Sequence, residues 1–169
     1  LVRRDLELHF GQFGENVKLF SIEDRATYDL SEGLRQFLHF FSDNNACLRR
    51  SVWECFPYPE VEFGEDQLWA KRVLDEGYAK LYVPAATVFH SHNYGVRQLF
   101  ERNLVEAKYF RRHFGYVLTR GFSRLLKDSF AMTRADCLFL RRRRLRRSSL
   151  SVFMQNFSKL LGHYVGGCL

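Results

Sequence analysis

The sequence lacks several features that would assign it to a common class of protein. No apolar run approaches the ~20 residues of a membrane-spanning helix, and the first residues, LVRRDLELHF, are charged where a secretory signal would be apolar. The four cysteines form no C-x-x-C pair and have no histidine-rich partner spacing. These absences argue against a zinc site and a disulfide framework, and free thiols in a reducing cytoplasm are expected.

The chain has 169 residues, of which 46% are hydrophobic, and it contains no internal repeat. This length allows one domain with a sizeable core, or a smaller core with an appendage. The first residue is not Met. We therefore expect the sequence to be the middle of a longer protein.

Charge divides the chain into two zones. The net charge of +7 is the balance of −5 over residues 1–96 and +12 over residues 97–169. Such a split predicts two functional zones, with the basic one facing the phosphates of lipid or nucleic acid. We place the boundary near residue 95, with a compact α/β part over 1–95 and a helical, basic tail over 96–169.

The first zone contains several short strand-like runs and one clear helix. The strand-like runs are Val17–Ile22, Ala46–Leu48, Tyr78–Val83 and Ala86–His90. A helical turn is expected to begin at Arg49–Ser51 and to end before Pro57. The helix follows Gly64 and stops at Gly77, with Glu65 and Asp66 in its first turn. Acids at a helix start are often only stabilising, because the helix dipole favours negative charge there.

The second zone is expected to be helical. Val96–Phe114 has apolar residues at near-helical spacing with Arg and Lys between them. A further helix is expected from about Ser129 to Arg147, ending in RRRRLRR. A last amphipathic stretch, Val152–Val165, precedes Gly166 and Gly167.

Three polar groups stand at the ends of short elements in the first zone. They are Asp43-Asn44-Asn45, Glu65-Asp66 and His90-Ser91-His92. In α/β proteins such ends tend to line one cleft. Two histidines two residues apart on a strand point the same way, which suits a metal or phosphate site. Taken alone, His90 is more often a packed or hydrogen-bonded histidine.

Three segments carry a resemblance to a known family. They are FFSDNNACLRRSVWE, FGEDQLWAKRVLDEGY and KLYVPAATVFHSHNY, in this order and spacing. Together they resemble the second half of family 2 glycosyltransferases with the GT-A fold, and most closely bacterial rhamnosyltransferases that build surface polysaccharides. The resemblance covers roughly Phe37 to Phe114, and a weaker similarity is present in KLLGHYVGG near the C-terminus. It implies an α/β fold that is the C-terminal part of a GT-A domain.

The resemblance also implies roles for individual residues. Asp66 would be the general base of an inverting sugar transfer, and Glu65 would orient the site or bind acceptor hydroxyls. His90, with His92, would hold a divalent cation, Mg²⁺ or Mn²⁺, at the donor diphosphate. Acceptor-side substrate contacts would come from four residues: Asn44, Asn45, Arg49 and Trp69. For Arg49 and Arg50 a solvated or structural role is equally compatible with the sequence.

One family feature is missing from the sequence. No D-x-D metal motif occurs, and the nucleotide-binding strands of the family's first half have no counterpart. We therefore expect the longer protein to be an inverting glycosyltransferase and the isolated 169-residue chain to have little or no activity. The donor implied by the resemblance is dTDP-L-rhamnose, and the acceptor is a glycan or a lipid-linked sugar.

The basic tail favours a membrane surface. Arg141–Arg147 followed by an amphipathic segment is typical of a helix lying on anionic lipid, which predicts a cytoplasmic protein peripheral to the inner membrane face. A solvated basic helix packed on the rest of the chain is the plain alternative. Nucleic acid is disfavoured, because no helix-turn-helix or RNP-like pattern is present and residues 1–96 are acidic. A non-catalytic partner-binding remnant is the third possibility.

Overall fold

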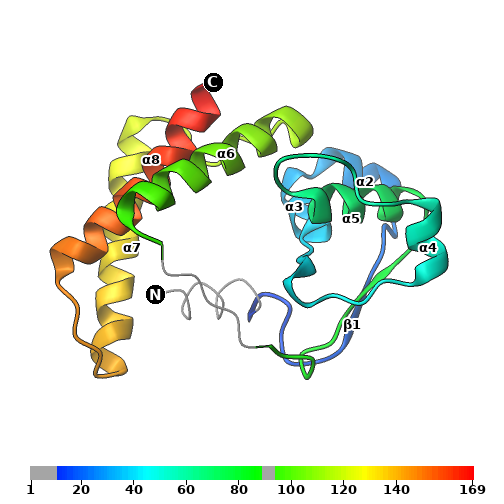
Figure 1. The fold of residues 1–169 in the computed structure, drawn as a ribbon, viewed down its shortest axis with the longest axis horizontal. Helices are drawn as coiled ribbons and strands as arrows, with labels where there is room; N and C mark the ends of the chain where they lie inside the picture. Colours follow the sequence, from blue (N-terminus) through cyan, green and yellow to red (C-terminus); the bar gives the residue numbers. More distant parts are fainter. Residues whose placement is uncertain (1–10, 89–93) are drawn as a thin grey trace. The chain divides into compact units, whose positions relative to one another are not determined.

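The computed structural model describes residues 11–88 and 94–169. These residues form two compact units, which we call the N-terminal unit (11–88) and the C-terminal unit (94–169). The N-terminal unit combines short helices with a two-stranded sheet, and the C-terminal unit is helical (Figure 1). The described chain is thus mainly helical, and whether it belongs to a GT-A fold stays a prediction.

The N-terminal unit is built from seven short elements. In chain order they are β1 (Lys18–Phe20), α2 (Arg25–Leu30), α3 (Glu32–His39), the 3₁₀ turn η1 (Asp43–Asn45), α4 (Arg50–Cys55), α5 (Glu65–Asp75) and β2 (Lys80–Tyr82). The two strands pair antiparallel, with Leu19 opposite Leu81. Strands within Val17–Ile22 and Tyr78–Val83, and a helical turn after Arg49, are confirmed.

Two other expected strands do not form among the described residues. Ala46–Leu48 is irregular backbone, and Cys47 is exposed rather than buried. Leu48 alone is drawn inward, where it packs on the cluster around Trp69. A single apolar contact does not supply the partner strand that a buried strand requires. Ala86–Val88 is also irregular, and the rest of that run lies outside the described residues.

Aromatic side chains close the core between the sheet and α3. The Phe13 side chain is buried, and its ring centroid lies 5.1–5.5 Å from those of Phe20, Phe37, Phe40 and Tyr82. Tilted and edge-on pairs at this spacing add to the burial of apolar area. The two strands and α3 are therefore joined through one ring.

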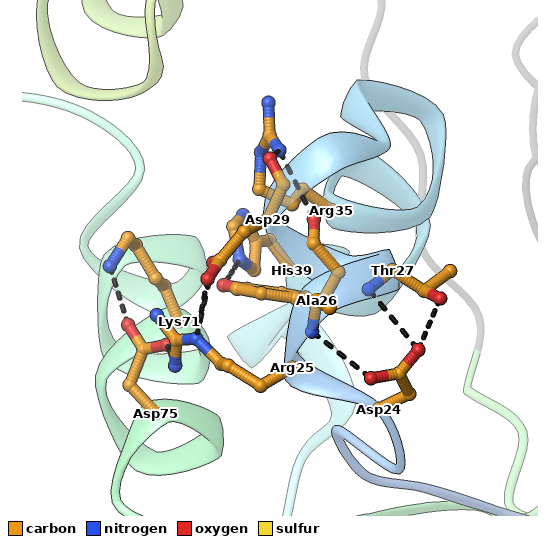
Figure 2. A network of polar contacts seen from close by, with 10 residues as sticks. Asp24, Arg25, Ala26, Thr27, Asp29, Arg35, His39, Lys71 and Asp75 are labelled. Carbon is orange, nitrogen blue, oxygen red and sulfur yellow. Dashed lines mark hydrogen bonds and ion pairs between the residues drawn. The ribbon is translucent and has the colours of Figure 1, made fainter.

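A polar network holds α2 against α5 (Figure 2). Asp24 caps α2 by accepting from the backbone N–H groups of Ala26 and Thr27. Arg25 donates to Asp75 at 2.8 Å, and Lys71 donates to the same carboxylate at 2.5 Å. The two cations lower the pKa of Asp75, outweighing the opposite effect of its partial burial. This carboxylate thus fixes the C-terminal half of α5.

The C-terminal unit consists of three long helices. They are α6 (Val96–Phe114), α7 (Phe122–Arg142) and α8 (Ser149–Cys168). Figure 1 shows α8 lying against α6 and α7. The bounds expected for α6 are confirmed. The α7 helix begins seven residues earlier than the Ser129 expected from sequence, because Gly121, with φ +86°, lets the chain turn abruptly into it. The helix ends at Arg142.

Two glycines set the contact between α6 and α8. A Cβ atom at Gly162 would lie 2.5 Å from the Phe100 carbonyl oxygen, and one at Gly166 would lie 2.5 Å from the Leu104 carbonyl oxygen. The two helix backbones therefore approach as closely as the glycines allow. The final glycines continue the helix to Cys168 instead of ending it.

The contact is completed by polar groups on both helices. His163 of α8 lies 3.2 Å from the Glu106 carboxylate of α6. Ser158 donates to the carbonyl oxygen of Val96 at 2.6 Å, and Arg111 donates to that of Gly167. The buried face of α8 is thus used for packing within the unit. No described helix is long and apolar enough to cross a membrane.

Candidate active site

Asp66 stands at the start of α5, where the chain reverses through Gly64. Gly64 has φ +70°, a left-handed conformation that glycine adopts without strain, and it is the N-cap residue of the helix. Glu65 and Asp66 occupy the first turn, as the sequence predicts. The free N–H groups and the dipole at this end favour a carboxylate. The Asp66 side chain is partly buried.

The turn η1 supplies a partner of Asp66 that is distant in sequence. The backbone N–H of Asp43 donates to one Asp66 carboxylate oxygen at 3.4 Å, and the N–H of Gln67 donates to the other at 2.7 Å. Residues 23 positions apart in sequence are brought together by the first of these bonds. The groups Asp43-Asn44-Asn45 and Glu65-Asp66, two of the three polar groups expected to share a site, therefore lie together.

The environment of Asp66 makes it a stronger base than an ordinary aspartate. Its pKa is raised from 3.8 to about 6, chiefly because burial removes water from the charged carboxylate. The two backbone N–H donors act in the opposite direction, and the negative charges of Asp43 and Glu65 raise the pKa further. A carboxylate with a pKa near neutrality is typical of a general base.

Aromatic packing fixes η1 against α5. Trp69, one helical turn after Glu65, is buried with Val52 and Val73. Its ring centroid lies 5.5 Å from that of Phe41 and 5.8 Å from that of Tyr58. Because Phe41 precedes Ser42 and Asp43 in the chain, its contact with Trp69 holds η1 close to the first turn of α5.

Trp69 therefore has a role other than the one implied by the resemblance. Its side chain is 6% exposed, and its indole nitrogen donates to the Phe56 carbonyl oxygen at 2.5 Å. A buried ring with its polar atom already bonded has little surface for a substrate. The structure places Trp69 in the core beneath the site, where it supports the carboxylate position.

Asn45 connects the site to the loop that follows β2. Its side-chain amide donates to the Ala86 carbonyl oxygen at 2.8 Å. Ala86 lies four positions before His90 in the chain. His90 and His92 themselves fall outside the described residues. The contact thus holds Ala86, which precedes the His90-Ser91-His92 group in the chain, beside η1.

The remaining predicted substrate contacts are exposed. Asn44 donates to the Ser42 hydroxyl at 2.9 Å and is accessible at the surface of η1. Arg49 is the exposed N-cap residue of α4. Asn44 lies in η1 and Arg49 directly before α4, so both are carried by the stretch of chain that contributes Asp43.

The described residues do not by themselves offer a metal site. Within residues 11–88 and 94–169, no group of three or more His, Cys, Asp or Glu side chains is arranged to hold an ion. The acids Asp43, Glu65 and Asp66 are near one another but do not form such a group. The histidines assigned to a metal by resemblance lie outside this part of the chain.

Asp43 and Tyr58 are two residues beside Asp66 to which the sequence assigns no individual role. Asp43 affects Asp66 through its backbone N–H and through its charge. Burial raises the pKa of the Tyr58 hydroxyl, and the charges of Asp43, Asp66 and Glu65 raise it further, which places Tyr58 beside the acids. The polar run Asp43-Asn44-Asn45 gives a signal for Asp43, whereas no local pattern identifies Tyr58.

Comparison with known proteins gives two relatives. The chain is 32% identical, over 135 residues, to the O-antigen chain rhamnosyltransferase WbaN of Salmonella anatum. It is 30% identical over 135 residues to the O-antigen chain rhamnosyltransferase RfbN of Salmonella typhimurium. Each alignment covers 75% of this chain and 40% of the relative.

The chain therefore spans about 40% of the length of the curated relatives that it matches. No family model matches it, and no solved structure does. The resemblance to rhamnosyltransferases is confirmed at the level of these two sequences. Membership of family 2 and the GT-A fold stay predictions. By sequence, the chain is similar to bacterial O-antigen rhamnosyltransferases.

Proposed function

We propose that this chain is the acceptor-side part of an inverting glycosyltransferase of family 2 with a GT-A fold. The similarity of three quarters of the chain to two O-antigen rhamnosyltransferases is the observation that carries the proposal. The proposed donor is dTDP-L-rhamnose and the proposed acceptor is a glycan or lipid-linked sugar. The proposed location is the cytoplasmic face of the inner membrane.

In the proposed reaction, Asp66 removes the proton from an acceptor hydroxyl. The hydroxyl oxygen forms a bond to the anomeric carbon of the sugar from the face opposite the nucleotide. The bond from that carbon to the diphosphate oxygen breaks, and its electron pair leaves with the nucleotide. The proton passes to the Asp66 carboxylate and is then released to water. Because the anomeric carbon undergoes a single displacement from the opposite face, its configuration inverts and no covalent enzyme intermediate forms.

The surroundings of Asp66 support this role. With a pKa of about 6, the carboxylate is roughly nine-tenths ionised at neutral pH and holds a proton better than an ordinary aspartate. Packing between Trp69 and Phe41 limits its movement, which reduces the entropy lost in positioning the base. Glu65, Asn44 and Arg49 are the proposed acceptor contacts, since their side chains reach the surface near η1 and α5.

A divalent cation would neutralise the departing diphosphate. His90 and His92 are its proposed ligands within this chain. Asn45 is proposed to position the loop that leads to them, through its bond to Ala86.

The test is a pair of substitutions in the longer protein that carries this chain. Asp66→Asn removes the base without changing its size and should lower the transfer rate from dTDP-L-rhamnose by about 10²–10⁴-fold. Glu76→Gln, at the exposed C-cap of the same helix, removes one charge as a matched control and should leave the rate within about threefold. Transfer by folded Asp66→Asn protein at the wild-type rate would refute the assignment.

A further inference from the structure

The junction of α7 and α8 forms a second feature with a defined chemistry. A cavity of about 390 Å³ lies there, between the C-terminal end of α7 and the N-terminal end of α8. Eight residues line it: Cys137, Leu140, Arg141, Leu145, Arg146, Arg147, Ser148 and Ser149. Three of these are arginines, so the lining is strongly basic.

The basic charge of this cavity is not neutralised from within its own segment. Residues 137–169 contain no Asp or Glu at all. Arg147 donates to the neutral side chain of Gln155 at 3.0 Å. Among the described residues, no ion pair is found for Arg141 or Arg146. Several guanidinium groups without carboxylates repel one another, and a bound anion relieves that repulsion.

The turn that forms the cavity is defined by its backbone. Arg144 has φ +54°, and the N–H groups of Arg144 and Leu145 donate to the carbonyl oxygens of Arg141 and Leu140 at 3.1 and 2.9 Å. This is the Schellman arrangement that ends many helices, with arginine at the position usually taken by glycine. The run of arginines is thus folded into a turn around the cavity, instead of continuing as the expected helix.

One exposed apolar side chain lines the cavity, and two others belong to residues next to lining residues in the chain. Leu145 lines the cavity and is 56% exposed, and Leu138 and Leu150 each adjoin a lining residue in sequence and are 45% and 69% exposed. A small inorganic anion has no apolar surface to bury against such side chains. A phosphate group attached to an apolar chain would match both the arginines and the leucines.

We propose that the α7–α8 cavity binds a phosphate group carried by a lipid. Arg141, Arg146 and Arg147 would hold the phosphate through charge-assisted hydrogen bonds. The neighbouring leucines would contact the apolar part of the lipid. The inference deepens the proposed function, since a lipid-linked acceptor carries such a phosphate, but it rests on the cavity and is tested by binding alone.

The test compares two double variants of the full chain that lose equal charge. Arg141→Gln/Arg146→Gln alters the cavity lining, whereas Arg142→Gln/Arg144→Gln alters the same arginine run outside the lining. Binding is measured by co-sedimentation with phosphatidylcholine vesicles with or without phosphatidylglycerol, and folding is checked by circular dichroism. The cavity variant should bind anionic vesicles about tenfold more weakly or worse, and the control should lose about threefold or less.

Inorganic pyrophosphate and single-stranded DNA distinguish the sources of the phosphate. If pyrophosphate shifts the amide resonances of Ser148 and Ser149, the phosphate group alone is sufficient for binding. If only the anionic lipid shifts them, the apolar chain is also needed, and both results support the site. Equal losses in the two variants, no binding to anionic vesicles, or tighter binding to the DNA at the same ionic strength would overturn the proposal.

Discussion

The packing of α8 on α6 makes a quantitative prediction about Gly162. In Gly162→Ala the added Cβ would lie 2.5 Å from the Phe100 carbonyl oxygen and 2.9 Å from the Leu104 backbone nitrogen. Both are main-chain atoms and cannot rotate away, so the helices must separate by about 1 Å. Overpacking of this kind costs about 1–3 kcal/mol, while alanine's helix propensity returns about 1 kcal/mol. We expect a net loss of up to about 2 kcal/mol in the free energy of unfolding.

Gly167→Ala is the matched control in the same helix. Its Cβ would meet Val117 at 3.4 Å, an ordinary contact, so its stability should stay equal to wild type or rise by up to about 1 kcal/mol. Denaturant unfolding of the helices is followed by far-ultraviolet circular dichroism. The fluorescence of Trp53 and Trp69 follows the N-terminal unit, to which both residues belong. Gly162→Ala that is more stable than wild type would refute the close helix contact.

Three further predictions concern stability. The folded-state pKa of Asp66 is raised to about 6. The free energy of unfolding of wild type should therefore fall by about 1–1.5 kcal/mol relative to Asp66→Asn as pH rises from about 4 to about 6, after allowance for partial exposure. An unchanged difference in stability across that range would contradict the raised pKa. Asp75, whose pKa is lowered, has the opposite sign: the advantage of wild type over Asp75→Asn should disappear as pH falls below about 4. His163→Ala should cost about 1–3 kcal/mol at neutral pH by leaving Glu106 of α6 without its partner, measured by chemical denaturation, and a change near zero would contradict a stabilising pair.

Local patterns predicted the helices whose ends carry their own signals. Gly64 and Gly77 have positive φ values and frame α5, and the apolar spacing of Val96–Phe114 matches α6 at both ends. The arginine run gave a misleading signal, because its residues have good helix propensity while their mutual repulsion and the Schellman turn end α7 at Arg142.

Long-range contacts were beyond local patterns. The bond from Asp43 to Asp66 depends on Phe41 meeting Trp69, and no spacing rule relates these positions. The resemblance implies a substrate contact for Trp69, whereas its side chain is buried, and burial follows from tertiary packing. The glycines near the C-terminus read as a helix end, whereas the structure uses Gly162 and Gly166 for backbone contact. The sequence predicts Asp66 as the site carboxylate, and the structure adds the groups that shift its pKa.

The pH dependence of sugar transfer tests the central proposal most directly. If Asp66 is the general base with a pKa of about 6, kcat/KM of the longer protein should be level above that pH and fall about tenfold per pH unit below it. The measurement uses dTDP-L-rhamnose with an acceptor, at pH values where the circular dichroism spectrum is unchanged. A profile that stays level down to about pH 4.5 would contradict the assignment of Asp66.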